Sequence, residues 1–228
     1  PRPPTARAAM EIELERMQRS AVYAGLGLPN IRPSRTMQDD TLEALVGLHL
    51  ELSRRAKEAI ATPEEARRAN TELRQFMRTQ DNFIPEIEEL AQEQLRQVGH
   101  STGALTHRSV SLMAKNRGFD LFFVADLPHS TRSVTDLENG RIYLPPASSP
   151  GGQGLRSMAL QALAHRLLGH HEPDSYAEFL RQRLEINYFA AACLMPLRQS
   201  VDFLTGAKAE RNLAIEDFRD AFGVTHEG

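Results

Sequence analysis

The chain has 228 residues, 41% hydrophobic and 25% charged, which is enough for one main domain with a sizeable core and a helical appendage. No stretch approaches the roughly 20 apolar residues of a membrane span, and the opening Pro1-Arg2-Pro3-Pro4 lacks the basic-then-apolar order of a signal peptide, so we expect a cytoplasmic protein. The net charge of −3 argues against a nucleic-acid-binding surface on this chain.

The single cysteine, Cys193, excludes an internal disulfide and cannot hold an iron–sulfur cluster alone. Any such cluster would lie outside this chain. We expect Cys193 to be a small core residue on a helix.

Helical periodicity dominates the first hundred residues. A helix is predicted over residues 6–19, followed by a linker at 25–30. Residues 41–60 predict an amphipathic helix whose apolar stripe is Leu45, Leu48, Leu52, Ala56 and Ala59. Such helices can pair within a chain or across a dimer, and the sequence leaves both open.

Two further helices are predicted before residue 100. One begins at Pro63, because Thr62 and Glu65 have the spacing of a capping box and proline suits the first helical position. The other covers residues 85–98.

The small sheet is predicted between residues 119 and 144. A helix over 106–116 precedes a strand at 119–124, which is rich in aromatic and β-branched residues. Asn139-Gly140 indicates a hairpin between strands at 133–135 and 141–144.

Helices return after a Gly/Pro/Ser-rich loop at residues 145–154, and loops in such positions often gate a pocket. We expect helices at 155–170, 174–195, 197–208 and 215–222. The elements together predict an α+β fold, mainly α-helical, with a small antiparallel sheet.

The segment His165-Arg166-Leu167-Leu168-Gly169-His170 has the outline of an H-E-x-x-H zinc-protease helix without its working parts. Arg166 stands where a glutamate would deprotonate the zinc-bound water, and Gly169 stands where the second histidine ligand would be. His170 does not replace that ligand in a regular helix, because position i+5 points roughly 140° away from His165.

A second segment, Glu185-Ile186-Asn187-Tyr188-Phe189-Ala190-Ala191-Ala192-Cys193-Leu194-Met195-Pro196, resembles the E-A-N-x-F-A-x-x-L-L-M-P helix of the ImmA/IrrE-like family. In that family this helix supplies a third acidic zinc ligand, matched here by Glu185. Residues 187–196 resemble more narrowly the actinobacterial short-chain fatty acid regulators, a branch that lost its metal. Residues 62–68 and 77–91 also resemble this branch, and the resemblance covers about residues 60–225.

The resemblance implies a degenerate zinc-peptidase-like domain without a metal, and a regulator of propionate metabolism rather than an enzyme. It implies a helical linker or dimerisation region at 1–100, an ImmA/IrrE-like ligand-binding domain at 101–228, and a helix-turn-helix DNA-binding domain in another part of the protein. The implied ligand is a short-chain acyl-CoA, propionyl-CoA, or coenzyme A itself. We expect a homo-oligomer, because bacterial regulators of this sort usually address symmetric DNA sites.

Coenzyme A needs cations for its phosphates, an aromatic surface for adenine and a dry slot for the acyl group. Our candidate ligand-binding residues are Arg141, Tyr143, Arg156, His165, Arg166, Asn187 and Tyr188, with Phe122 and Phe189 as apolar wall. Strand alternation puts Arg141 and Tyr143 on one side of the hairpin. Arg156 and Arg166 would point about 80° apart on one helix, so they would flank a site.

Plainer roles exist for several of these residues. Arg141 can be a solvated charge, Tyr143 a half-buried strand residue and Phe189 a core residue. Glu185 can form an ion pair with Arg166 and seal the pocket. Two further functions stay open: a residual zinc peptidase, and a scaffold whose helices only dimerise.

Overall fold

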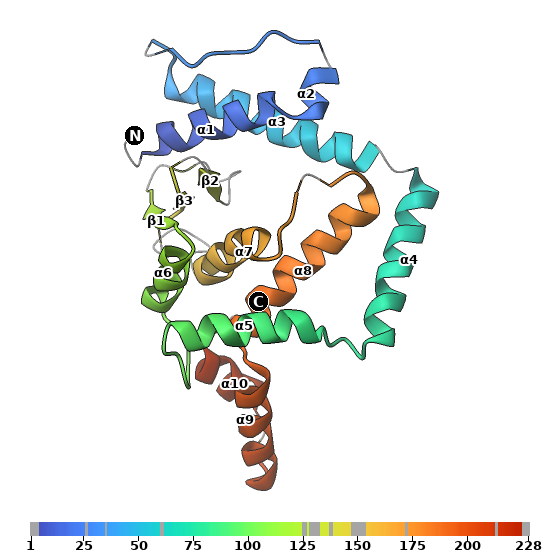
Figure 1. The fold of residues 1–228 in the computed structure, drawn as a ribbon, viewed down its shortest axis with the longest axis vertical. Coiled ribbons are helices and arrows are strands. Elements are labelled where there is room, and N and C mark those ends of the chain that lie inside the picture. The colour runs from blue at the N-terminus through green and yellow to red at the C-terminus, as the bar shows by residue number, and fades with distance from the viewer. Residues whose placement is uncertain are drawn as a thin grey trace.

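The computed structural model describes residues 5–25, 27–34, 36–59, 62–124, 127, 133–136, 139–146, 154–171, 173–212 and 214–224; for residues 21, 22 and 53–59 it describes the backbone alone. These ranges are mainly helical and contain one small sheet (Figure 1). The predicted class, α+β and mainly α, is confirmed. Among the described helices, none is long and apolar enough to cross a membrane.

The elements follow one another in this order: α1 Ala6–Gln18, α2 Ala21–Gly25, α3 Asp39–Ala59, α4 Pro63–Thr79, α5 Pro85–Gln97, α6 His107–Asn116, β1 Asp120–Phe123, β2 Val134–Asp136, β3 Arg141–Leu144, α7 Leu155–Leu167, α8 Tyr176–Leu194, α9 Leu197–Ala209 and α10 Ile215–Phe222.

The sheet has the strand order β1-β3-β2 and is mixed. The predicted hairpin is confirmed, because β2 pairs antiparallel with β3 across the Asn139-Gly140 turn. The prediction of an antiparallel sheet is wrong for β1, which runs parallel to β3 with Phe122 opposite Tyr143. A turn signal fixes the pairing of neighbouring strands only, so the strand on the other edge of β3 could not be read from it.

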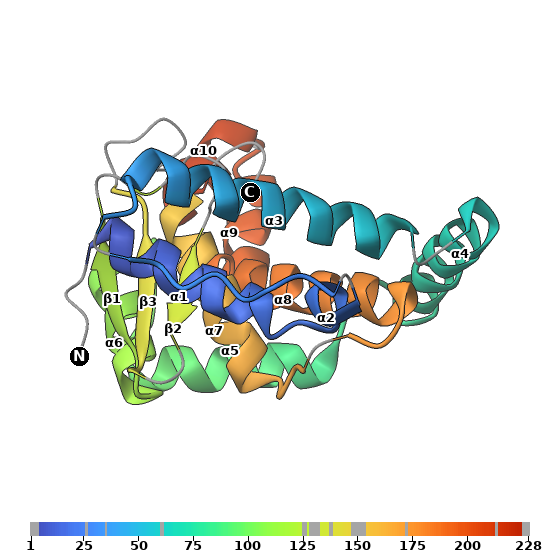
Figure 2. The same ribbon diagram turned by 90° about the horizontal axis from the view of Figure 1, so that it is seen from above.

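Strand β3 separates two hydrophobic cores. Ile142 and Leu144 face the larger core, to which α5, α6, α7 and α8 contribute. Tyr143, which alternates with them, faces a smaller core shared with α1 and α3. Figures 1 and 2 show α1 and α3 on one side of the sheet and α6 and α7 on the other. All three residues are buried because β3 is covered on both faces.

The predicted division at residue 100 stays a prediction, and close contacts cross it. Helix α5 packs along α8, and α4 also reaches α8. The hydroxyl of Tyr188 on α8 accepts a hydrogen bond from the backbone N–H of Ile84 at 3.1 Å. The larger core therefore includes residues from both predicted regions.

The apolar stripe predicted for α3 is only partly right: Leu45 packs against the smaller core, Leu48 and Leu52 do not, and the side chains of Ala56 and Ala59 lie outside the described residues. Leu42 and Val46 are fully buried against α1, whereas the side chains of Leu48 and Leu52 are 61% and 50% exposed. The helix carries apolar residues on two neighbouring faces, and periodicity alone does not say which of them meets the core.

The start of α4 agrees with its sequence. The Thr62 hydroxyl accepts from the Glu65 backbone N–H at 3.2 Å, and the Glu65 carboxylate accepts from the Thr62 N–H at 2.7 Å. The pKa of Glu65 is lowered, because its carboxylate accepts from the Thr62 backbone N–H and also from the Thr62 hydroxyl, at 3.0 Å. The loop predicted at 145–154 lies mostly outside the described residues, since 147–153 are not among them.

The turn before β3 gives a testable prediction. Gly140 has a φ of +61°, and a Cβ at this position would overlap the carbonyl oxygen of Gly118. We expect Gly140→Ala to lower the free energy of unfolding by about 3 kcal/mol, through backbone strain and the clash together. Urea denaturation measures the loss.

Gly99→Ala is the matched control, because Gly99 has a similar φ of +67° with open space around it. Strain alone predicts a loss of about 1 kcal/mol for this variant. Equal losses in the two variants would contradict the steric part of the explanation.

Candidate functional site

The end of α7 brings two histidines together. The helix stops at Leu167, and Gly169 adopts a φ of +68°, a left-handed conformation that glycine tolerates best. The backbone N–H of His170 then donates to the carbonyl of His165 at 2.9 Å. Our expectation that the two side chains diverge is wrong, because it assumed a regular helix to residue 170. Their Nδ1 atoms lie 3.1 Å apart.

His170 continues to Glu185 on α8. Its Nε2 lies 2.8 Å from Glu185 Oε2, and its side chain is only 7% exposed. Arg181 Nε donates to the other carboxylate oxygen, Oε1, at 2.9 Å. Both oxygens of Glu185 therefore have partners.

The ion pair between Glu185 and Arg166 that we considered as an alternative is not formed among the described residues. Arg166 is exposed on α7, one residue after His165. Arg181 takes its place, because Arg181 lies one helical turn before Glu185 on the same helix.

The histidines and Glu185 form a chain of pairwise contacts rather than a set converging on one point. His170 contacts His165 through one ring nitrogen and Glu185 through the other. Among the described residues, no group of three or more His, Cys, Asp or Glu side chains could hold a metal ion.

A polar pair lies one turn earlier on α7. Gln161 Nε2 donates to Asn187 Oδ1 on α8 at 2.9 Å, and Asn187 is exposed. Gln161 was not among our candidates. Its position four residues before His165, on the same face of α7, is the signal that could have found it.

Tyr188 points to α5, so it does not join Asn187. Its hydroxyl donates to Glu88 Oε1 at 3.0 Å and accepts from Ile84 N–H. Burial raises the pKa of Tyr188, and the Glu88 carboxylate raises it further, against the opposing effect of the Ile84 N–H.

The other candidates occupy two further places. The Arg156 guanidinium donates to the carbonyls of Leu105 and Gly223, and burial lowers the pKa of Arg156. Arg141 and Tyr143 lie on one side of the hairpin as predicted, since both contact the ring of Phe122. Tyr143 is fully buried in the smaller core.

The seven candidates are therefore not brought to one place. His165, Arg166 and Asn187 are each exposed, His165 and Arg166 on α7 and Asn187 on the neighbouring α8, and we call these three residues the α7–α8 face. Of the two residues considered as an apolar wall, Phe122 is at the sheet and Phe189 is fully buried in the larger core.

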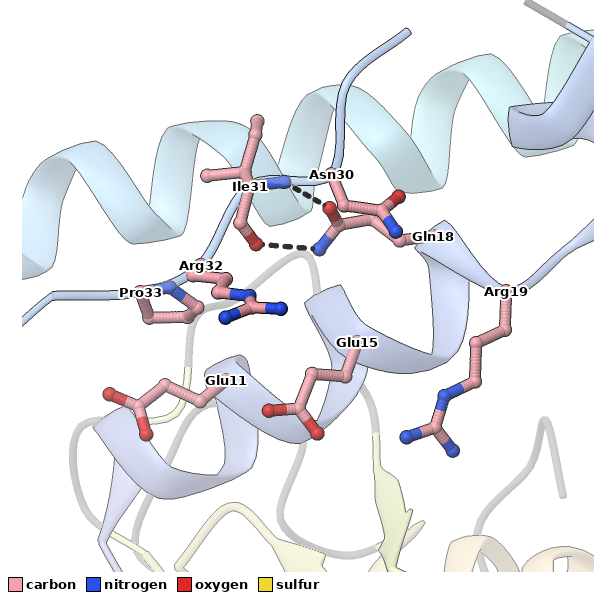
Figure 3. A pocket seen from close by; sticks show the side chains of 8 residues that line it. All are labelled: Glu11, Glu15, Gln18, Arg19, Asn30, Ile31, Arg32 and Pro33. Atoms are coloured by element: carbon pink, nitrogen blue, oxygen red, sulfur yellow. Dashed lines mark hydrogen bonds between the residues drawn. The ribbon is translucent and has the colours of Figure 1, made fainter. Parts of the chain in front are cut away.

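A hollow of about 370 Å³ lies elsewhere, between α1 and the segment of residues 30–33 (Figure 3). The Gln18 amide pairs with the backbone N–H and carbonyl of Ile31 and holds this segment beside the helix. Glu11 and Glu15 of α1 and Arg32 of this segment are among the residues that line it. Our sequence analysis did not predict this hollow.

No protein-family model matches the chain, and no curated protein sequence matches it. A solved structure, a Mycobacterium tuberculosis transcriptional regulator, aligns with a TM-score of 0.53 and 21% identity over 68% of this chain. The likeness establishes a shared fold. The aligned region spans 49% of that regulator, about half of its length.

Two tyrosines, Tyr188 half-buried and Tyr143 fully buried, give a matched pair of predictions. Tyr188→Phe removes two hydrogen bonds and leaves the Ile84 N–H and Glu88 Oε1 without this partner. We therefore expect the free energy of unfolding to fall by about 2 kcal/mol. The Tyr143 hydroxyl is buried without a hydrogen-bond partner among the described residues. Tyr143→Phe is therefore expected to be neutral or stabilising, by up to about 1 kcal/mol. Urea denaturation of both variants checks the order; a larger loss for Tyr143→Phe would contradict it.

Cys193 is fully buried, as the sequence predicted. Burial raises the pKa of its thiol far above the usual range, and the Glu88 carboxylate adds to this effect. We expect a thiol reagent to leave the native protein unmodified at mildly alkaline pH and to react fully in denaturant. The reaction is measured by absorbance. Rapid labelling of the native protein would contradict the prediction and show that the thiol is accessible.

Proposed function

We propose that this chain is the ligand-sensing region of a bacterial transcription regulator of propionate and short-chain fatty acid metabolism. Its ligand is a short-chain acyl-CoA, propionyl-CoA, and the signal passes to a separate helix-turn-helix DNA-binding domain. The shared fold with a mycobacterial transcriptional regulator supports a regulator-associated domain. The motif at residues 185–196 supports the narrower assignment to the short-chain fatty acid regulators.

The observation that carries this proposal is that both carboxylate oxygens of Glu185 are occupied by other side chains. This residue stands at the position of the third zinc ligand, yet its oxygens are bound by His170 and Arg181. Arg166 stands at the position of the catalytic base and cannot accept a proton. A former catalytic face with these substitutions supports binding rather than catalysis, and a domain without a resident metal.

The α7–α8 face offers part of the chemistry that coenzyme A requires. Arg166 supplies an exposed guanidinium for a phosphate, while His165 and Asn187 supply polar groups for the amides of the pantetheine arm. Arg156 and Arg141 are less suited, since Arg156 binds two backbone carbonyls and Arg141 lies over the Phe122 ring.

Ligand binding on this face would act through α8. The Arg181 guanidinium lies over the ring of Phe76 on α4, at 6.0 Å from its centroid, and Tyr188 binds Glu88 on α5. A ligand that prefers one position of α8 therefore biases α4 and α5 as well. The shift is limited by the difference in its affinity for the two arrangements.

Calorimetric titration with propionyl-CoA, free coenzyme A, propionate and zinc tests the proposal. We expect saturable binding of propionyl-CoA and none of zinc. Arg166→Gln and Asn187→Ala should each weaken binding about tenfold or more, because a charged or polar partner of the ligand is lost.

Arg108→Gln is the matched control, since Arg108 is an exposed arginine on α6. It should leave the affinity unchanged. If neither propionyl-CoA nor free coenzyme A binds, the sensor function is rejected. Saturable zinc binding would favour a peptidase instead.

A further inference from the structure

Helix α4 has two faces of different character. On the face toward α8, Ala69 is buried and Met77 packs against the larger core. The rest of the helix surface is polar and turned to solvent. Figures 1 and 2 both show α4 at the edge of the molecule away from the sheet, so this outward face is open to a large partner.

Three exposed arginines, Arg67, Arg74 and Arg78, form a straight row on the outward face. Their spacing of seven and four residues places them within about 20° of one direction around the helix. That direction is roughly 120° from Leu73, at the middle of the apolar face. At a rise of about 1.5 Å per residue the row is about 16 Å long. We call these residues the arginine row.

Among the described residues, no carboxylate forms an ion pair with the arginine row. Arg67 Nε donates to the Pro63 carbonyl at 3.1 Å, which leaves its two terminal amino groups for a ligand. Glu72 points about 140° away from the row. Glu64 flanks the row only in the first turn, where a carboxylate suits the helix dipole.

The arginine row is unfavourable for the helix by itself. Arg74 and Arg78 are one turn apart, and like charges at this spacing repel each other. On α5, by contrast, Arg96 pairs with Glu93. An anion along the row would remove the repulsion, and a guanidinium group binds phosphate with two parallel hydrogen bonds. The row is therefore suited to an anionic partner.

We propose that the arginine row binds the phosphate backbone of duplex DNA. Each DNA strand carries one negative charge per about 3.4 Å of the helix axis, so a straight row of this length meets several phosphates. A single small anion would instead need guanidinium groups that converge on one point. The choice of DNA among linear polyanions rests on the proposed function, since a transcription regulator acts on DNA.

The polar character of the outward face favours DNA over other anionic partners. Thr71 and Gln75 lie beside the arginines, and the apolar residues are turned toward α8. Interfaces with DNA are more polar and more positive than interfaces between proteins. A membrane-binding helix needs apolar residues exposed beside its cations. The net charge of −3 is a sum over the whole chain and does not describe this face.

Fluorescence anisotropy of labelled duplex DNA, titrated with the whole chain at several salt concentrations, tests the proposal. We expect weak binding that is independent of DNA sequence, because phosphate contacts position a protein without reading bases. The logarithm of the affinity should fall with the logarithm of the salt concentration with a slope near about −3, from one released counterion per arginine.

Arg74→Gln and Arg78→Gln should each weaken DNA binding several-fold at low salt and reduce the size of the slope by about one. Glutamine is nearly as good a helix former as arginine, and circular dichroism checks that the helical content is kept. A slope that neither variant changes would overturn the proposal.

Arg108→Gln is the matched control. It removes the same charge from α6, and Figure 1 shows α6 and α4 at opposite sides of the molecule. Its affinity for DNA and its slope should stay nearly unchanged. An effect as large as that of Arg74→Gln would show that net charge alone governs binding, and would overturn the arginine row as the site.

The outcomes separate this inference from the proposed function. If the chain binds propionyl-CoA but no DNA at low salt, the arginine row is rejected and the proposed function stands. If it binds DNA with the expected slope but no propionyl-CoA, the acyl-CoA ligand is rejected and the row stands. Binding of polyglutamate in place of DNA, weakened by Arg74→Gln, would overturn the inference and assign the row to an acidic protein.

Discussion

Helix α8 is the element on which the larger part of the structure depends, because α4, α5 and α7 all pack against it. Ala190 and Cys193 are small enough to let neighbouring helices approach closely, and Phe189 fills the centre of the core. Its polar residues then reach outward in three directions: Glu185 to the end of α7, Tyr188 to α5 and Arg181 to α4. One helix thus joins the candidate ligand face to both neighbouring helices.

Much of the fold could be predicted from local signals. The capping box at Thr62, the Asn139-Gly140 turn and the buried Cys193 depend on neighbouring residues or on hydrophobicity, and all are confirmed. The errors concern choices that local sequence leaves open. Leu48 is as apolar as Leu42, yet only Leu42 faces α1, and nothing within β1 specifies that it runs parallel to β3.

The candidate site shows the same limit. Periodicity correctly placed Arg141 and Tyr143 on one side of a hairpin, but not the core into which that side would be buried. The contact between His165 and His170 depends on Gly169, which adopts a left-handed conformation two residues after α7 ends at Leu167. Helical spacing predicts the direction of a side chain only within a helix. The direction of the His170 side chain, beyond the end of α7 at Leu167, therefore could not be predicted from the sequence.

The position of Cys193 also has a practical consequence. It is the only cysteine of the chain, and the core shields it completely. A cysteine introduced on the surface would therefore be the sole site for a spin label or fluorophore in the native protein. One label on α4 and another on α8 would allow the distance between these helices to be followed as a ligand is added, without first removing a native thiol.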